Sequence, residues 1–219
     1  YEAPAEGGIT RMLGVFQSVD GVGEIGTVRS ARDYYVSLAL GHDAVYLHAG
    51  GSPGAYEAIA KWGVTALDCV NGPYEGTLFW RDAYRRKHAG LEHSVLTSGE
   101  KIQELLPTYS KVNLQHKDGY EYPLTFREDG TPDGGGTAGT VTVRFSSYKT
   151  GVFRYDADSG KYLVEEYGNP YVDGNTGEQV GVTNVLVLFT DISTIKGDTA
   201  GRQSVRITGT GKGYYACGG

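Results

Sequence analysis

The stretch SARDYYVSLALGHDAVYLHAGGSPGAYEAIAKWG, residues 30–63, decides the fold of this chain. Within it, residues 44–48 are short, apolar and partly β-branched, which is typical of a buried strand. Two glycines follow, Ser52 is a favoured N-cap residue, and Pro53 stands at the favoured first helical position. Gly63 is the predicted end of this second helix. The stretch therefore predicts a buried strand that leads directly into a capped helix.

The same order of elements is predicted on the N-terminal side. Residues 9–17 read as a strand with apolar residues on both faces, and Ser30 is the predicted N-cap of a helix over residues 31–40. Gly41 is expected to end that helix. Strand, helix, strand, helix in succession imply an α/β layer with at least one crossover connection.

The helical signals continue to about residue 107. Residues 78–86 (LFWRDAYRR) fit either a strand or a helix. Thr97 followed by Glu100 matches a capping box, which predicts a helix through Leu106 that Pro107 closes.

From Tyr120 onward the pattern favours β structure, because polar and apolar residues alternate with period two. The predicted strands are residues 140–146, 151–155, 161–167, 183–190 and 203–209. DADSGK and DGNTGE supply hairpin turns. We therefore predict an α+β protein with an N-terminal α/β subdomain (residues 1–127), a Gly/Asp-rich loop or linker (128–139) and a mostly antiparallel β-rich subdomain (140–219).

Composition excludes some classes of protein. A hydrophobic content of 39% and a charged content of 21% fit an ordinary globular protein. The net charge of −6 argues against broad nucleic-acid binding, which usually needs a basic face. No apolar run approaches the ~20 residues that span a bilayer. The two cysteines, Cys69 and Cys217, are far apart, which favours two separate thiols over one disulfide.

The main candidate site is a set of cationic residues at a helix start. Arg29, Ser30 and Arg32 stand where free backbone N–H groups and guanidinium groups attract an anion. Two cations at a helix N-terminus oppose the helix dipole, so they require a nearby negative charge. That charge is either a ligand or an internal carboxylate. The internal candidates are Glu2, Glu6 and Asp33.

His48 and Arg11 are further candidates. His48 ends a buried strand before the Ser52 helix start, so it is placed for ligand contact, proton transfer or metal binding, or for a hydrogen bond to the neighbouring loop. Arg11, inside a strand, is expected to pair with Glu6 or with Glu2. A Glu–His–Arg set would also suit acid/base chemistry on a phosphodiester or glycoside.

Established motifs for cofactors and metals are absent from the sequence. There is no GxSxG elbow, Walker loop, HExxH or CxxC pair, and the spacing of His88 and His93 matches no strong metal motif. We therefore expect no cofactor and no metal.

Four ordered segments of the chain match a known family: YEAPAEGGITR, IGTVRSARDYY, AVYLHAGGSP and FWRD. With them the chain resembles the YerB-like lipoproteins of Gram-positive bacteria, a family of unknown function. The resemblance spans nearly all of the chain and implies two subdomains and an extracytoplasmic, lipid-anchored location. Relatives carry a secretion signal with a lipid-anchored cysteine and continue at both ends, so this chain is expected to be truncated at both ends. Relatives often have proline where this sequence has Thr27 and Asp33.

These observations lead to three functional hypotheses. The first is an envelope module that binds an anionic or carbohydrate-like, cell-wall-derived ligand in an Arg/His-lined cleft between the halves. The predicted ligand-binding residues are Glu6, Arg11, Arg29, Ser30, Arg32, His48 and Ser52. The alternatives are a hydrolase of phosphodiester or glycosidic bonds and a structural scaffold for another envelope protein. Membrane contact is expected only through the missing anchor.

Overall fold

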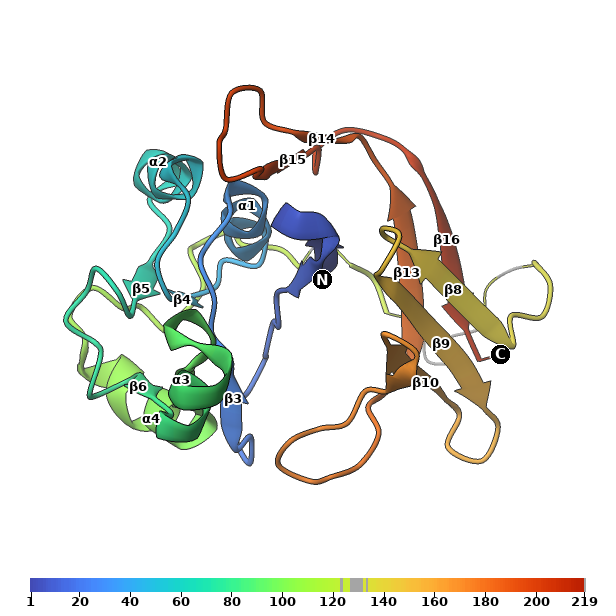
Figure 1. Ribbon diagram of the computed structural model, residues 1–219, viewed down its shortest axis with the longest axis horizontal. Coiled ribbons are helices and arrows are strands. Elements are labelled where there is room, and N and C mark those ends of the chain that lie inside the picture. Colours follow the sequence, from blue (N-terminus) through green and yellow to red (C-terminus); the bar gives the residue numbers. More distant parts are fainter. Residues whose placement is uncertain (123, 127–131, 133, 219) are drawn as a thin grey trace. The chain divides into compact units, whose positions relative to one another are not determined.

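A computed structural model describes residues 1–122, 124–126, 132 and 134–218 (Figure 1). The chain divides into two compact units, each with its own set of elements. The α/β unit is Gly14–Pro123, and the β-rich unit combines Tyr1–Leu13 with Leu124–Gly219. The predicted α+β class is confirmed. The division places the first thirteen residues with the β-rich unit, whereas the sequence assigned them to the α/β subdomain, and the predicted linker at 128–139 lies partly outside the described residues.

The α/β unit contains four α-helices within its described residues. Its elements are β3 (Glu24–Gly26), α1 (Asp33–Gly41), β4 (Tyr46–His48), α2 (Pro53–Trp62), β5 (Ala66–Asp68), β6 (Trp80–Arg81), α3 (Ala83–Ala89), β7 (Val95–Ser98) and α4 (Gly99–Leu105), with short 3-10 helices at Leu91–His93 and Leu106–Thr108. Strands β4 and β5 pair in parallel, and β3, β7 and β6 form an antiparallel sheet in that order. The parallel pair confirms the predicted crossover, which α2 makes.

Helix α2 begins and ends where its sequence predicts. The Ser52 side chain accepts a hydrogen bond from the Ala55 N–H at 3.1 Å, and Pro53 opens the helix. Gly63 ends it in the left-handed conformation, with φ of 64°, which glycine adopts without steric strain. Local signals alone therefore position the loop that joins β4 to α2.

Replacing Ser52 with alanine is expected to lower the free energy of unfolding of the α/β unit by about 1 kcal/mol, because the Ala55 N–H loses its acceptor. Ser52→Gly should lower it by only a few tenths of a kcal/mol. Urea unfolding followed by tryptophan fluorescence measures this, since Trp62 and Trp80 both lie in the α/β unit. Equal effects of the two substitutions would contradict a capping role.

Two predicted cap residues are wrong by one or two positions. Helix α1 has Arg32 as its N-cap, not Ser30, because Ala31 still pairs in a bridge with Gly51 and keeps this backbone extended. Helix α4 is capped by Ser98 and not by Thr97. Thr97 belongs to β7, and its hydroxyl donates to the Leu78 carbonyl at 2.8 Å. In both places strand pairing extends further than the local helix signal.

Residues 78–86 combine both of their predicted structures. Trp80–Arg81 form β6, and Asp82 then caps α3 by accepting from the Arg85 N–H at 2.7 Å. The core of the α/β unit lies beside these strands. Its buried residues are Ala49, Leu67, Cys69, Tyr74, Leu78, Phe79, Val95 and Leu106.

The β-rich unit is built mainly from antiparallel strands. Its elements are β1 (Glu2–Pro4), β2 (Thr10–Met12), β8 (Thr140–Arg144), β9 (Thr150–Asp156), β10 (Lys161–Glu166), β11 (Asn169–Pro170), β12 (Gly181–Val182), β13 (Asn184–Phe189), β14 (Ile192–Thr194), β15 (Gln203–Val205) and β16 (Lys212–Cys217), with a 3-10 turn at Glu6–Gly8. Strands β11, β10, β9 and β8 are neighbours in that order, and β12 also pairs with β10. The other antiparallel pairs are β1–β2, β13–β16 and β14–β15. Both predicted hairpin turns, at 156–161 and 173–178, reverse the chain.

Strand formation in this unit is less extensive than predicted. Only Thr10–Met12 of residues 9–17 form a strand, and these three residues pair with the three residues of β1. Within the described residues after Tyr120, the first strand begins at Thr140. The short β1–β2 hairpin joins the larger sheet through side chains. The Ser146 hydroxyl donates to the Gly8 carbonyl at 2.6 Å, and Lys149 pairs with Glu2.

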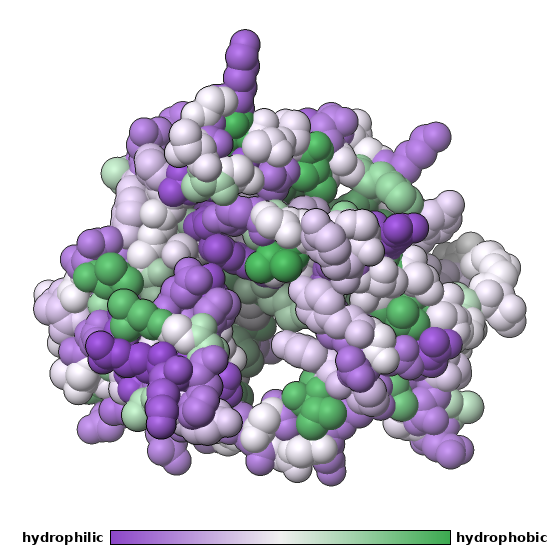
Figure 2. All heavy atoms as spheres, viewed as in Figure 1, coloured by the Kyte–Doolittle hydropathy of each residue, from purple (hydrophilic) through white to green (hydrophobic). Residues whose placement is uncertain are grey.

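The surface and the thiols have ordinary features. Cys69 and Cys217 are free thiols, and burial raises the pKa of Cys69 to about 11. The face in Figure 2 is largely polar, and its apolar side chains form separate patches. Among the described residues, every helix is too short or too polar to cross a bilayer.

Candidate functional site

The carboxyl ends of the two parallel strands place His48 and Asp68 side by side. They are the last residues of β4 and β5, and they are direct partners in the parallel register. In α/β proteins this end of the strands is where ligands bind. The loop after His48 carries the predicted Gly50–Gly51 turn, so the fold builds this part of the site as the sequence indicates.

Asp68 organises this end of the unit. Its Oδ1 accepts from the backbone N–H groups of Gly50 and Val70, at 2.7 and 2.8 Å. Its Oδ2 accepts from the Tyr56 hydroxyl at 2.7 Å and from the Asn71 amide at 3.1 Å. Burial opposes ionisation of Asp68, but these hydrogen bonds outweigh it and hold the pKa below its ordinary value. The carboxylate fixes the turn after β4 to the turn after β5.

His48 is enclosed by aromatic rings. Its side chain is 2% exposed, its ring stacks on Tyr46 at 5.2 Å between centroids, and Tyr56 approaches edge-on at 6.2 Å. Nδ1 lies 2.8 Å from the Gly50 carbonyl, which accepts a hydrogen bond from the Nδ1–H tautomer. Burial lowers the pKa of His48, although the Gly50 carbonyl and the Asp68 carboxylate act in the opposite direction. The neutral ring therefore braces the loop.

Burial also raises the pKa of Tyr56, to about 12, and the hydrogen bond to Asp68 adds to the rise. Asp68, Tyr56 and Asn71 were missed as members of this group. They lie on different elements, with Tyr56 in α2, Asp68 at the end of β5 and Asn71 in the turn after β5. Only the parallel register of β4 and β5 indicates that Asp68 stands opposite His48.

The arginines predicted at the helix start have partners within the α/β unit. Arg29 donates to the Glu92 carbonyl at 2.5 Å and pairs with its carboxylate at 3.5 Å. Arg32 is 5% exposed and donates to the carbonyl groups of Ala31 at 2.7 Å and Ser30 at 3.3 Å. The carboxylate that pairs with Arg29 is that of Glu92, and not one of the three carboxylates considered from the sequence.

Glu6 and Arg11 lie in the β-rich unit and form an ion pair at 3.5 Å. The structure therefore brings together Glu6 with Arg11, as predicted for a structural pair. The other predicted site residues belong to the α/β unit: Arg29, Ser30, Arg32, His48 and Ser52.

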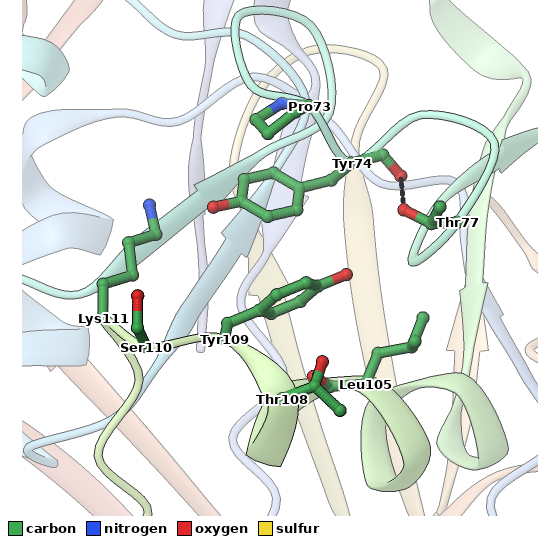
Figure 3. Close-up of a pocket in the computed structure, with 8 residues that line it drawn as sticks. All are labelled: Pro73, Tyr74, Thr77, Leu105, Thr108, Tyr109, Ser110 and Lys111. Atoms are coloured by element: carbon green, nitrogen blue, oxygen red, sulfur yellow. Dashed lines mark hydrogen bonds between the residues drawn. The ribbon is translucent and has the colours of Figure 1, made fainter.

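A separate pocket of about 460 Å³ opens in the α/β unit (Figure 3). It is lined by Pro73, Tyr74, Thr77, Leu105, Thr108, Tyr109, Ser110 and Lys111. The volume lies within the range of pockets for small ligands, about 300–1,000 Å³. Sequence analysis missed this pocket, because its two segments are about thirty residues apart and neither carries a motif.

Two tyrosine rings form the wall of this pocket. Tyr74 and Tyr109 meet edge-to-face, with centroids 5.1 Å apart. Thr77 holds the Tyr74 backbone by donating to its carbonyl at 3.1 Å. The Lys111 ammonium lies 5.3 Å from the Tyr74 ring centre and donates to the Ala66 carbonyl at 2.8 Å. Since an ammonium has three donors, Lys111 retains capacity for an anionic group.

Two domain families match consecutive parts of the chain. Residues 1–112 match the N-terminal domain, and residues 141–219 the C-terminal domain, of a family described as "Protein of unknown function (DUF3048)". The chain belongs to the DUF3048 family. Comparisons with individual proteins confirm the resemblance to YerB-like proteins.

One relative is the Bacillus subtilis (strain 168) protein named "Putative lipoprotein YerB", which is 31% identical over 218 residues. The match covers 97% of this chain and 61% of the relative, so the chain spans about three fifths of that protein. The crystal structure of the Bacillus subtilis YerB protein matches with a TM-score of 0.81 and 27% identity. That match covers 99% of this chain and 69% of the solved chain.

Proposed function

We propose that this chain is the extracytoplasmic part of an envelope lipoprotein and that its α/β unit binds a carbohydrate-like ligand that bears an anionic group. The location is carried over from the lipoprotein name of the YerB relative. The ligand class is supported by one observation, the pocket that Tyr74, Tyr109 and Lys111 line.

The chemistry of the pocket suits a sugar. Tyrosine rings offer flat apolar faces to the C–H faces of a sugar ring, and their hydroxyl groups can bond its hydroxyls. Ser110 and the two threonines of the lining add further donors and acceptors. Lys111 adds one positive charge for a carboxylate or phosphate on that sugar. A few polar groups around an aromatic wall are typical of small-molecule sites.

The predicted anion-binding residues remain part of this proposal as a second contact region. Arg29 is the member best able to exchange its partner, because its side chain is 22% exposed and that of Glu92 is 75% exposed. Ion pairs of such exposure are weak, roughly 0–1 kcal/mol, so a ligand anion can replace Glu92. The loop around Arg29 would be supported by Ser30, Arg32, His48 and Ser52. The remaining two predicted residues, Glu6 and Arg11, would contribute from the β-rich unit, where they form an ion pair.

Calorimetric titration with N-acetylmuramic acid and N-acetylglucosamine tests the proposal, because the acid carries a carboxylate that the neutral sugar lacks. We expect the acid to bind about tenfold more tightly, a difference of ~1.4 kcal/mol. Lys111→Ala should abolish that preference, and Tyr109→Ala should weaken both sugars. The matched control is Lys61→Ala, which removes an exposed lysine on α2 of the same unit.

Absence of binding of either saccharide to the unsubstituted protein would contradict the proposal. The same conclusion would follow if Lys111→Ala and Lys61→Ala had equal effects. Arg29→Ala separates the two contact regions. A loss of acid binding in Arg29→Ala but not in Lys111→Ala would place the anion at the helix start instead of the pocket.

A further inference from the structure

Lys149 is the most deeply buried cationic side chain among the described residues. It directly precedes β9 in the β-rich unit and is 1% exposed. Two carboxylates face its ammonium group, Glu166 at the end of β10 and Glu2 in β1. Charged groups are rarely buried to this extent without a specific role.

The contacts around this lysine are close and shielded from solvent. Nζ is in direct contact with Oε2 of Glu166 and lies 2.9 Å from Oε1 of Glu2. The rings of Tyr167 and Phe145 lie 4.9 and 5.8 Å from Nζ. These rings take the place of water beside the Lys149 nitrogen.

The contact between Lys149 and Glu166 is not an ordinary hydrogen bond. In the part of the chain that the structure describes, Nζ of Lys149 and both carboxylate oxygens of Glu166 are buried and lack a hydrogen bond of acceptable geometry. Burying two ions is unfavourable, so a reaction that joins the amine to the carboxyl group would remove a cost of burial.

We propose that Lys149 and Glu166 react to form an intramolecular amide, an isopeptide cross-link between β9 and β10. In this reaction the ammonium proton first passes to the Glu166 carboxylate, Nζ then attacks Cδ of that carboxyl group, and an N–C bond forms. The Glu2 carboxylate takes the proton from the nitrogen and delivers it to the hydroxyl of the tetrahedral intermediate. The C–O bond then breaks and one water molecule leaves. No oxidant or other reactant is consumed.

The arrangement favours this reaction over hydrolysis. Reacting groups held in contact behave as though their concentration were as high as about 10⁵–10⁸ M. The amide product is also neutral, and it is less unfavourable to bury than two ions.

The two carboxylates have different roles. Glu166 is the acceptor, because both of its oxygens are buried and it directly contacts the amine. Glu2 instead accepts a hydrogen bond from the Thr10 hydroxyl at 2.5 Å, which holds its carboxyl group in place. A carboxylate at 2.9 Å from the nitrogen is positioned as a general base.

Mass spectrometry of the intact, folded protein tests the proposal. We expect a mass lower than the sequence mass by one water molecule. Trypsin should then fail to cut after Lys149 and should release a branched peptide in which residues 145–154 are joined to residues 162–196. An unmodified mass of the folded wild-type chain would overturn the proposal, and so would a branch that joins any other pair of residues.

Substitutions assign the roles and exclude dehydration elsewhere. Lys149→Met should have the mass of its own sequence, with no water lost. Glu2→Gln should accumulate the unmodified form, because the general base is absent. Glu165→Gln is the matched control, since Glu165 neighbours Glu166 but pairs with the exposed Arg154 on the sheet surface, and it should lose water like the wild type. Water loss in Lys149→Met would overturn the assignment.

Discussion

Lys149→Met lowers the free energy of unfolding of the β-rich unit by about 3–5 kcal/mol, because the substitution leaves the buried Glu166 carboxylate without the amine that it contacts. Glu2 and Glu166 would then face each other without the Lys149 nitrogen between them. The substitution also removes the contact between Lys149 and Glu2, which joins the β1–β2 hairpin to the larger sheet. Urea unfolding followed by far-UV circular dichroism of the strands measures it.

Two controls accompany this measurement. Lys161→Met removes an exposed lysine from β10 of the same sheet and should change the free energy of unfolding by no more than about 0.5 kcal/mol. Tryptophan fluorescence of Lys149→Met should keep the wild-type midpoint, because both tryptophans lie in the α/β unit. A loss below about 1 kcal/mol would mean that Glu2, Lys149 and Glu166 are exposed to water in solution and not buried together.

The elements that sequence predicts well are those with complete local signals. Helix α2 has a cap residue, a proline at its first position and a left-handed glycine at its end, and each acts within four residues. The hairpin turns of the β-rich unit are local in the same sense. Ser30 and Thr97 show the limit of such signals. Each has cap chemistry, but strand pairing with a distant segment decides its conformation.

The candidate sites depend on contacts that sequence spacing does not contain. His48 was identified because it ends a strand, while its partner Asp68 is defined only by the register of β4 with β5. Tyr74 and Tyr109 meet because two turns pack on the same core, which no local pattern of tyrosines indicates. Lys149 has no motif at all. Its role follows from burial between two carboxylates, one of them nearly 150 residues earlier in the chain.

Asp68→Ala is expected to lower the free energy of unfolding of the α/β unit by about 3 kcal/mol, because hydrogen bonds to a charged group contribute about 1.5–3 kcal/mol and several are lost together. The backbone N–H groups of Gly50 and Val70 would lose their acceptor. Asp68→Asn should have a smaller effect, since the amide oxygen can still accept from these two groups. Urea unfolding followed by tryptophan fluorescence gives both values.

The pH dependence separates Asp68 from His48. A carboxyl group whose pKa is lowered by folding stabilises the fold above its ordinary pKa of 3.8, and this contribution disappears as the pH falls through the lower, folded value. A histidine whose pKa is lowered by burial instead begins to destabilise the fold as the pH falls below 6.5, because the unfolded chain binds the proton first. Asp68→Asn should therefore flatten the loss of stability in the acid range and leave the loss that begins near pH 6.5. If both losses remained in Asp68→Asn, the carboxylate would not be the group that joins the turn after β4 to the turn after β5.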